Sequence, residues 1–194
     1  MTTDPGPARL PQLRPEDLSV EQRRLFDSIA TGPRASGPQA FALLGPGGGL
    51  VGPFNAMLLS PPVGSALQAV GAAVRYRSAL SDRAREIAIL VVAHHWQSAF
   101  EIFAHEELAL RAGLSGDELR AIRDAPADLV DPVERVVALT AGALSRSGDL
   151  DDDGYATARD ALGDRVLFEL TTIVGYYAAL ALQLRVYRVG RPAG

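Results

Sequence analysis

The chain of 194 residues contains no cysteine and no lysine. Without cysteine it has no thiol nucleophile, no disulfide and no thiolate ligand for a metal. Without lysine it cannot form a Schiff base, which excludes pyridoxal-phosphate chemistry. All 19 basic residues are arginine, and the 23 acidic residues leave a net charge of -4. We therefore expect no nucleic acid among the partners, since no excess of positive charge is present.

Long hydrophobic runs are also missing. The longest apolar segments, residues 87–93 and 173–184, are shorter than the roughly 20 residues that a membrane-spanning helix needs. The first residues lack the positively charged start and apolar run of a secretory signal. We therefore expect a cytoplasmic protein that does not bind a membrane.

Hydrophobic spacing predicts an all-α fold. From Phe54 onward the apolar residues recur at helical intervals, and no segment alternates with a period of two. Residues 1–17 are rich in proline and predict an extended arm, which leaves residues 18–194 as a single helical domain. Residues 31–53 are dense in glycine and proline and predict a long loop. Such a loop either covers a binding site or only connects helices at the surface.

The segment AHHWQSAFEIFAH, residues 93–105, holds all three histidines and the only tryptophan of the chain. Trp96 lies at the expected junction of two helices. Ser98 and Glu101 are three residues apart, which fits a capping box at the start of the second helix. The alternative interpretation is that both residues belong to a functional site.

Glu101 and His105 lie four residues apart on the second helix and hence on one face. Leu108 and Ala112 continue that face, so it is expected to point inward. A carboxylate and an imidazole in the interior are costly unless they are paired, and pairing fixes the tautomer that a general acid/base needs. The alternative is a core histidine whose hydrogen bonds are satisfied.

Glu86 opens the preceding helix, which is apolar on every side. Antiparallel packing through a short turn brings Glu86 level with His105 or beyond. A plain alternative is a carboxylate favoured by the helix dipole. A metal site is a further alternative, but His94 and His95 are adjacent and diverge on a helix, and no HxxxH or HExxH pairing exists. We therefore expect a site without metal.

The block REIAILVVAHHWQSAFEIFAHEELALRAGLS, residues 85–115, resembles the carboxymuconolactone decarboxylase family, which includes the alkylhydroperoxidase D group. The likeness runs from about residue 52 to residue 189. The peroxidase branch of the family has a glutamate, two cysteines and a histidine at a spacing that here reads Glu86, Ser98, Glu101 and His105. Both cysteines are replaced, so thiol peroxidase activity is not expected. In lacking the cysteine pair, the chain is similar to the branch of the family that resembles the decarboxylase itself.

The resemblance implies an all-helical subunit in a homotrimer or homohexamer, with a pocket at a subunit interface. It also implies decarboxylation of a small molecule with no metal and no organic cofactor. An isomerase, a dehydratase or a cyclase acting through an enolate remains an alternative, as does a helical oligomer that binds a small ligand without catalysis.

His105 is the predicted acid/base, with Glu101 or Glu86 setting its tautomer. Several polar and aromatic side chains are predicted to contact the substrate, with ordinary packing as the alternative for the two tyrosines: His94, His95, Trp96, Ser98, Tyr176 and Tyr177.

Overall fold

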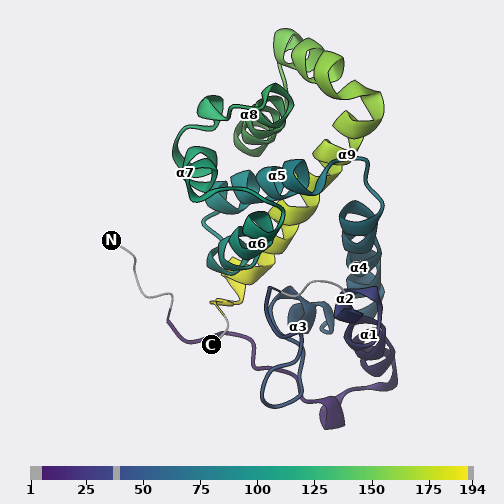
Figure 1. Ribbon diagram of the computed structural model, residues 1–194. Helices are drawn as coiled ribbons and strands as arrows, with labels where there is room; N and C mark the ends of the chain where they lie inside the picture. The colour runs from purple at the N-terminus through teal and green to yellow at the C-terminus, as the bar shows by residue number, and fades with distance from the viewer. Residues whose placement is uncertain (1–5, 37–39, 192–194) are drawn as a thin grey trace.

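The computed structural model describes residues 6–36 and 40–191 (Figure 1). Over these residues the protein is built from helices and contains no β-strand, which confirms the all-α prediction. The elements in chain order are the 3-10 helix η1 (Pro15–Asp17), α1 (Val20–Ala30), α2 (Pro33–Ser36), α3 (Pro53–Met57), α4 (Pro61–Tyr76), α5 (Asp82–His95), α6 (Ala99–Arg111), α7 (Gly116–Asp124), the 3-10 helix η2 (Pro126–Asp128), α8 (Pro132–Ser147) and α9 (Asp152–Val186).

Helix α5 lies at the centre of the molecule and packs against α6, α8 and α9 (Figure 1). Its side chains from Ile87 to Ala93 are all buried. A helix that is apolar on every side is stable only when other helices cover it. Each large aliphatic side chain buried there contributes roughly 1.5–3 kcal/mol. This burial holds α5 rigidly and so positions the residues that it carries into the interior.

Helix α9 is long and apolar and consists of two parts. Gly163 has φ 74° and ψ 162°, a conformation that interrupts the helix and changes its direction. The second part runs diagonally behind α5 and α6 (Figure 1). By length and composition alone α9 could cross a membrane, with 44% of its most apolar window buried in the fold. Fully buried residues such as Leu170, Ile173 and Ala181 account for that apolar character as part of the core.

The described part of the predicted N-terminal arm, residues 6–17, lies along the helical domain. The backbone N–H of Arg9 donates to the carbonyl of Tyr187, and that of Leu13 donates to the side-chain oxygen of Asn55. The arm ends in the 3-10 turn η1 rather than in an extended strand, because Pro15 presets a helical φ at its first position.

The predicted loop of residues 31–53 has structure of its own. It contains α2, and an antiparallel bridge between Leu44 and Leu50 closes a glycine-rich turn. Gly52 has φ 67°, and a Cβ there would lie 2.3 Å from the Phe100 ring. Only glycine therefore lets the loop pass this close over α6. The loop is packed against the domain, with its described residues beside the cavity considered next.

Candidate active site

A buried histidine and glutamate form the polar centre of the molecule. The Nδ1 atom of His105, on α6, lies 2.6 Å from Oε2 of Glu86, on α5. The two residues are only 7% and 2% exposed. The contact is the one that antiparallel packing of α5 and α6 predicts. With Glu86 ionised, Nδ1 carries the proton of this hydrogen bond, which leaves Nε2 as the ring atom that can exchange a proton with a ligand.

Several charges keep Glu86 ionised. Burial alone would raise the pKa of its carboxyl. The attraction and hydrogen bond of His105, together with Arg85 and Arg75, outweigh burial and hold the pKa below its usual range. Arg85 also pairs with Asp82 at 2.9 Å, and its Nε lies 3.6 Å from Glu86. Glu86 is therefore a fixed anion at neutral pH.

His105 opens onto a cavity between α6 and α9 on one side and α2, α3, α4 and the described loop residues 40–43 on the other. The cavity has a volume of about 640 Å³, including the part open to solvent. Much of the wall is aromatic or aliphatic, so the space suits a small, flat molecule. Its ionisable lining residues are Arg34, Arg75, Tyr76, Glu101, His105, Tyr176 and Tyr177.

Glu101 lies in the same cavity but does not contact His105 through a hydrogen bond. It is 3% exposed, and neither carboxyl oxygen bonds to any residue that the structure describes. Burial raises the pKa of Glu101 to about 8, and the neighbouring Ser98 hydroxyl offsets part of that rise without a bond of ordinary geometry. At neutral pH the carboxyl is therefore mostly protonated. Of the two carboxyls predicted to orient His105, Glu86 does so and Glu101 does not.

The predicted capping box of Ser98 and Glu101 is wrong. The end of α5 is a Schellman motif, in which the Ser98 N–H donates to the carbonyl of Ala93 at 2.9 Å and the Gln97 N–H to that of His94 at 3.1 Å. Gln97 takes the left-handed conformation, with φ 52°. In a capping box Glu101 would accept a hydrogen bond from the Ser98 N–H, but that N–H already donates to Ala93. The Ser98 side chain makes no capping bond.

Two buried tyrosines complete the polar lining. The Tyr177 ring packs edge-on against His105 with centroids 5.1 Å apart, and Tyr176 packs against Tyr177 at 5.2 Å. Burial raises the pKa of both phenols, to about 12 for Tyr176 and further for Tyr177. Both hydroxyls stay protonated and can donate hydrogen bonds.

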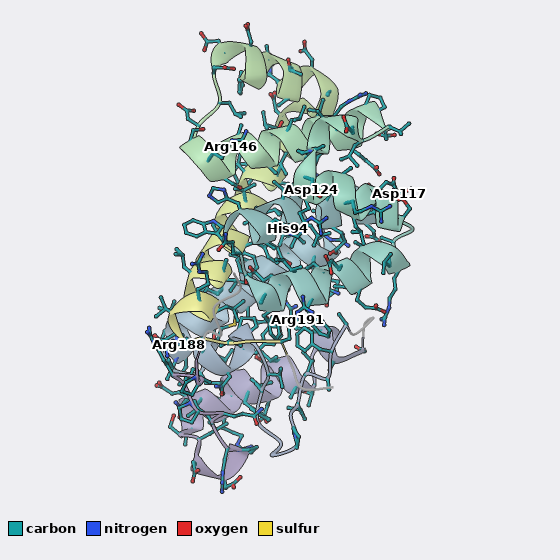
Figure 2. The ribbon with its side chains drawn as sticks, turned by 90° about the vertical axis from the view of Figure 1, so that its left-hand side faces the viewer. His94, Asp117, Asp124, Arg146, Arg188 and Arg191 are labelled. Atoms are coloured by element: carbon teal, nitrogen blue, oxygen red, sulfur yellow. The ribbon has the colours of Figure 1, made fainter. Side chains whose placement is uncertain are left out.

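The structure does not bring His94, His95, Trp96 or Ser98 to the wall of this cavity, which corrects the expectation that they contact its ligand. Eight residues of helix separate His94 from Glu86, about 12 Å along α5. His94 and His95 instead border a separate surface hollow with Arg146, whose side of the molecule Figure 2 shows. Burial lowers the pKa of His94. Trp96 packs half-buried against the core.

Sequence reasoning missed the residues that the N-terminal third brings to the cavity. Arg34, on α2, stacks its guanidinium over the Phe54 ring at 4.8 Å from the ring centroid. Phe41 packs edge-on against Phe100 at 4.8 Å. The available signal was Arg34 itself, because it is the only ionisable residue between positions 31 and 53. A single charge in an otherwise uncharged glycine- and proline-rich loop indicates a specific role.

No metal centre is evident in the part of the chain that the structure describes. Nowhere among those residues do three or more His, Asp or Glu side chains gather as possible ligands. Glu86 and His105 are instead directly hydrogen-bonded to each other.

The comparison with protein families confirms the resemblance seen in the sequence. Residues 61–144 match the model of the carboxymuconolactone decarboxylase family. The match runs from the start of α4 to within α8 and contains Glu86, Glu101 and His105. This segment of the chain is therefore similar to that family. No curated protein has a significantly similar sequence.

Solved structures share the fold across nearly the whole chain. The alkylhydroperoxidase AhpD core of a peroxidase-related protein from Ralstonia eutropha JMP134 superposes with a TM-score of 0.74 at 12% identity, covering 96% of this chain and 94% of that one. A peroxidase-related protein from Silicibacter sp. TM1040 gives 0.73 at 15% identity, over 100% and 96%. A variant of the debrominase Bmp8 in complex with 2,3,4-tribromopyrrole gives 0.73 at 12% identity, over 96% and 95%. At these identities the likeness establishes an AhpD-like fold.

Proposed function

We propose that this protein is an enzyme that performs acid/base chemistry on a small enolisable acid without a cofactor. Within that class we favour decarboxylation of a carboxylated lactone or a β-keto acid. The observation that carries the proposal is the buried 2.6 Å contact between His105 and Glu86 in the wall of the cavity. A fixed anion behind an imidazole that faces a ligand space is the arrangement by which proteins make histidine a general acid/base.

The reaction needs a proton donor to carbon and a stabiliser for oxygen. Breaking the bond to the departing carboxylate releases carbon dioxide and leaves its electron pair on the neighbouring carbonyl as an enolate. The protonated hydroxyls of Tyr176 and Tyr177 can donate to the enolate oxygen. The His105 imidazolium then gives its proton to the enolate carbon and recovers one from water. Glu86 stabilises the imidazolium and keeps Nδ1 as the protonated nitrogen.

The family and its structural relatives support the general class. One relative of the same fold, the debrominase Bmp8, was solved with a small, flat ring compound. The narrow, aromatic cavity of this chain suits a ligand of that shape. Thiol peroxidase chemistry is not proposed, because the sequence has no cysteine to oxidise.

The test is carbon dioxide release from a panel of carboxylated lactones and β-keto acids by the wild type, H105A and E86Q. Loss of the acid/base is expected to lower the rate at least ~100-fold in H105A. E107Q, which changes a half-exposed carboxylate on the same helix, serves as the matched control and is expected to match the wild type. Release that is unaffected by H105A would refute the role of His105. Release from no substrate would favour the second candidate function, a small-ligand-binding oligomer.

We also propose that the subunits form a homotrimer or homohexamer in the cytoplasm. Large apolar side chains on α9 support the assembly, because Phe168 is 71% exposed, Val186 55% and Tyr155 50%. Light scattering after size exclusion measures the state directly, and F168D is expected to shift it towards monomer. A wild-type monomer at micromolar concentration would contradict the assembly. A protein that sediments with the membrane fraction after cell fractionation would contradict the cytoplasmic location.

A further inference from the structure

The second carboxyl of the cavity, Glu101, has no role in the acid/base pair. It is buried in an apolar wall, and both of its oxygens lack a hydrogen bond within the described residues. An ionised carboxylate in that position would pay a desolvation cost that no partner compensates. The neutral acid, which carries an O–H donor, is therefore the form that this environment favours.

A buried donor needs an acceptor, and no described residue, the neighbouring Ser98 hydroxyl included, makes a hydrogen bond of ordinary geometry to Glu101. Leaving such a donor unbonded costs about 1–3 kcal/mol. A ligand in the cavity that Glu101 lines can supply the acceptor. An anionic oxygen is the strongest acceptor available, because O–H···O⁻ bonds are about twice as strong as neutral ones.

Tyr176 and Arg34 lie at the same part of the cavity. A Cβ on Gly71 would lie 2.3 Å from the Tyr176 hydroxyl and 3.3 Å from an Arg34 nitrogen, so the two groups meet over this glycine. Arg34 acts to lower the pKa of Tyr176 and Glu101 acts to raise it, which places the hydroxyl within electrostatic reach of both. Glu101, Tyr176 and Arg34 therefore line one cavity, and the tyrosine hydroxyl and the guanidinium meet at one place beside it.

We propose that Glu101 and Tyr176 form an oxyanion hole, in which both donate hydrogen bonds to one anionic oxygen of the ligand while Arg34 supplies positive charge. Pairing a tyrosine with a protonated carboxylic acid is an established way to stabilise an enolate. The ligand class that follows is a small, flat enolate or phenolate. This inference deepens the proposed function, since it assigns the group that would hold the enolate oxygen, and it can be tested by binding alone.

Several other titratable and charged groups surround Glu101. The titratable and charged groups of the elements packed about Glu101 are Arg34 of α2, Arg75 and Tyr76 of α4, Glu86 of α5, His105 of α6, and Tyr176 and Tyr177 of α9. Glu86 is held as an anion by His105 and the nearby arginines, and Tyr176 and Tyr177 stay protonated up to high pH. Glu101 is therefore the group whose ionisation adds a negative charge to the cavity near pH 8.

The probe is 4-nitrophenol, whose bound anion is visible by its absorbance, with 4-nitroanisole as a neutral molecule of similar shape. We expect the phenolate to bind more tightly than the anisole. Its affinity, corrected for the probe's own ionisation, should fall about tenfold per pH unit above about 8, as Glu101 ionises. In E101Q this alkaline fall should disappear. Y176F should weaken binding about 10–100-fold, the value of a hydrogen bond to a charged group.

E107Q is the matched control and should bind the phenolate as the wild type does. The proposal is overturned if the wild type does not prefer 4-nitrophenolate to 4-nitroanisole, or if the alkaline fall persists in E101Q. Phenolate binding without any carbon dioxide release would refute the decarboxylase and leave the oxyanion hole standing. Release without phenolate preference would do the reverse.

Discussion

The unpaired Glu101 carboxyl should make the stability of the protein depend on pH in a specific way. Burial raises its pKa from 4.5 to about 8 in the folded state, whereas the unfolded chain keeps the ordinary value. Between these two values the folded protein holds a proton that the unfolded chain has lost. Folding stability therefore falls as pH rises from about 4.5 to about 8 and then stays constant. Glu101→Gln removes this titration and should remove the loss.

The magnitude follows from the size of the shift. Each unit of pKa shift corresponds to about 1.4 kcal/mol. Between pH 5 and pH 8 the free energy of unfolding of the wild type should therefore fall by about 4 kcal/mol relative to that of E101Q. This is a large part of the total for a domain of this size, since domains are stable by roughly 5–15 kcal/mol.

Urea unfolding of both proteins at pH 5, 7 and 9 measures this difference. E107Q is again the control, because Glu107 lies at the surface and pairs only with Arg111 on its own helix. Its stability difference should stay within about 0.5 kcal/mol at all three pH values. A difference between E101Q and the wild type that is the same at pH 5 and pH 9 would refute the argument that Glu101 is neutral in the folded protein.

Three further changes test how the fold holds the site. Gly52→Ala combines a positive φ with a collision against Phe100, so it should destabilise by at least about 3 kcal/mol in urea unfolding and weaken 4-nitrophenolate binding. Gly163→Ala has a similar φ but open space around it, so only strain of about 1–3 kcal/mol is expected in thermal unfolding; an equal loss for both variants would contradict the collision. Arg83→Ala removes ion pairs to Glu134 at 2.8 Å and to Glu118 at 2.6 Å that join α5 to α8 and α7. It should cost about 1–3 kcal/mol, and an unchanged urea midpoint would contradict that role.

The features that sequence reasoning predicted depend on local pattern or on simple packing geometry. Helix α5 is apolar on every side, and this pattern predicts its central place. The contact of Glu86 with His105 follows from two antiparallel helices joined by a short turn. Each of these conclusions needs only helical periodicity and one short connection, which the sequence displays directly.

The features that it missed depend on contacts between distant segments or on competition for one backbone group. Arg34 reaches the cavity because α2 lies beside α3 and α4, and no helical period reports that placement. The capping box failed because the Schellman motif uses the Ser98 N–H first. His94 and His95 were grouped with His105 by closeness in sequence, whereas the helix axis carries them to another surface.

The replacement of cysteines changes what the shared framework can do. Where the resembling peroxidases carry a cysteine pair, this chain has Ser98 and Glu101, both buried. Position 101 lies one turn before His105 and lines the same cavity. A thiolate there would be a reductant that works by losing electrons. A neutral carboxyl there has a proton to donate and no electrons to give. Glu86 and His105 match the peroxidase spacing, and under the proposed function Glu101 supplies a proton where those enzymes use a thiol for redox chemistry.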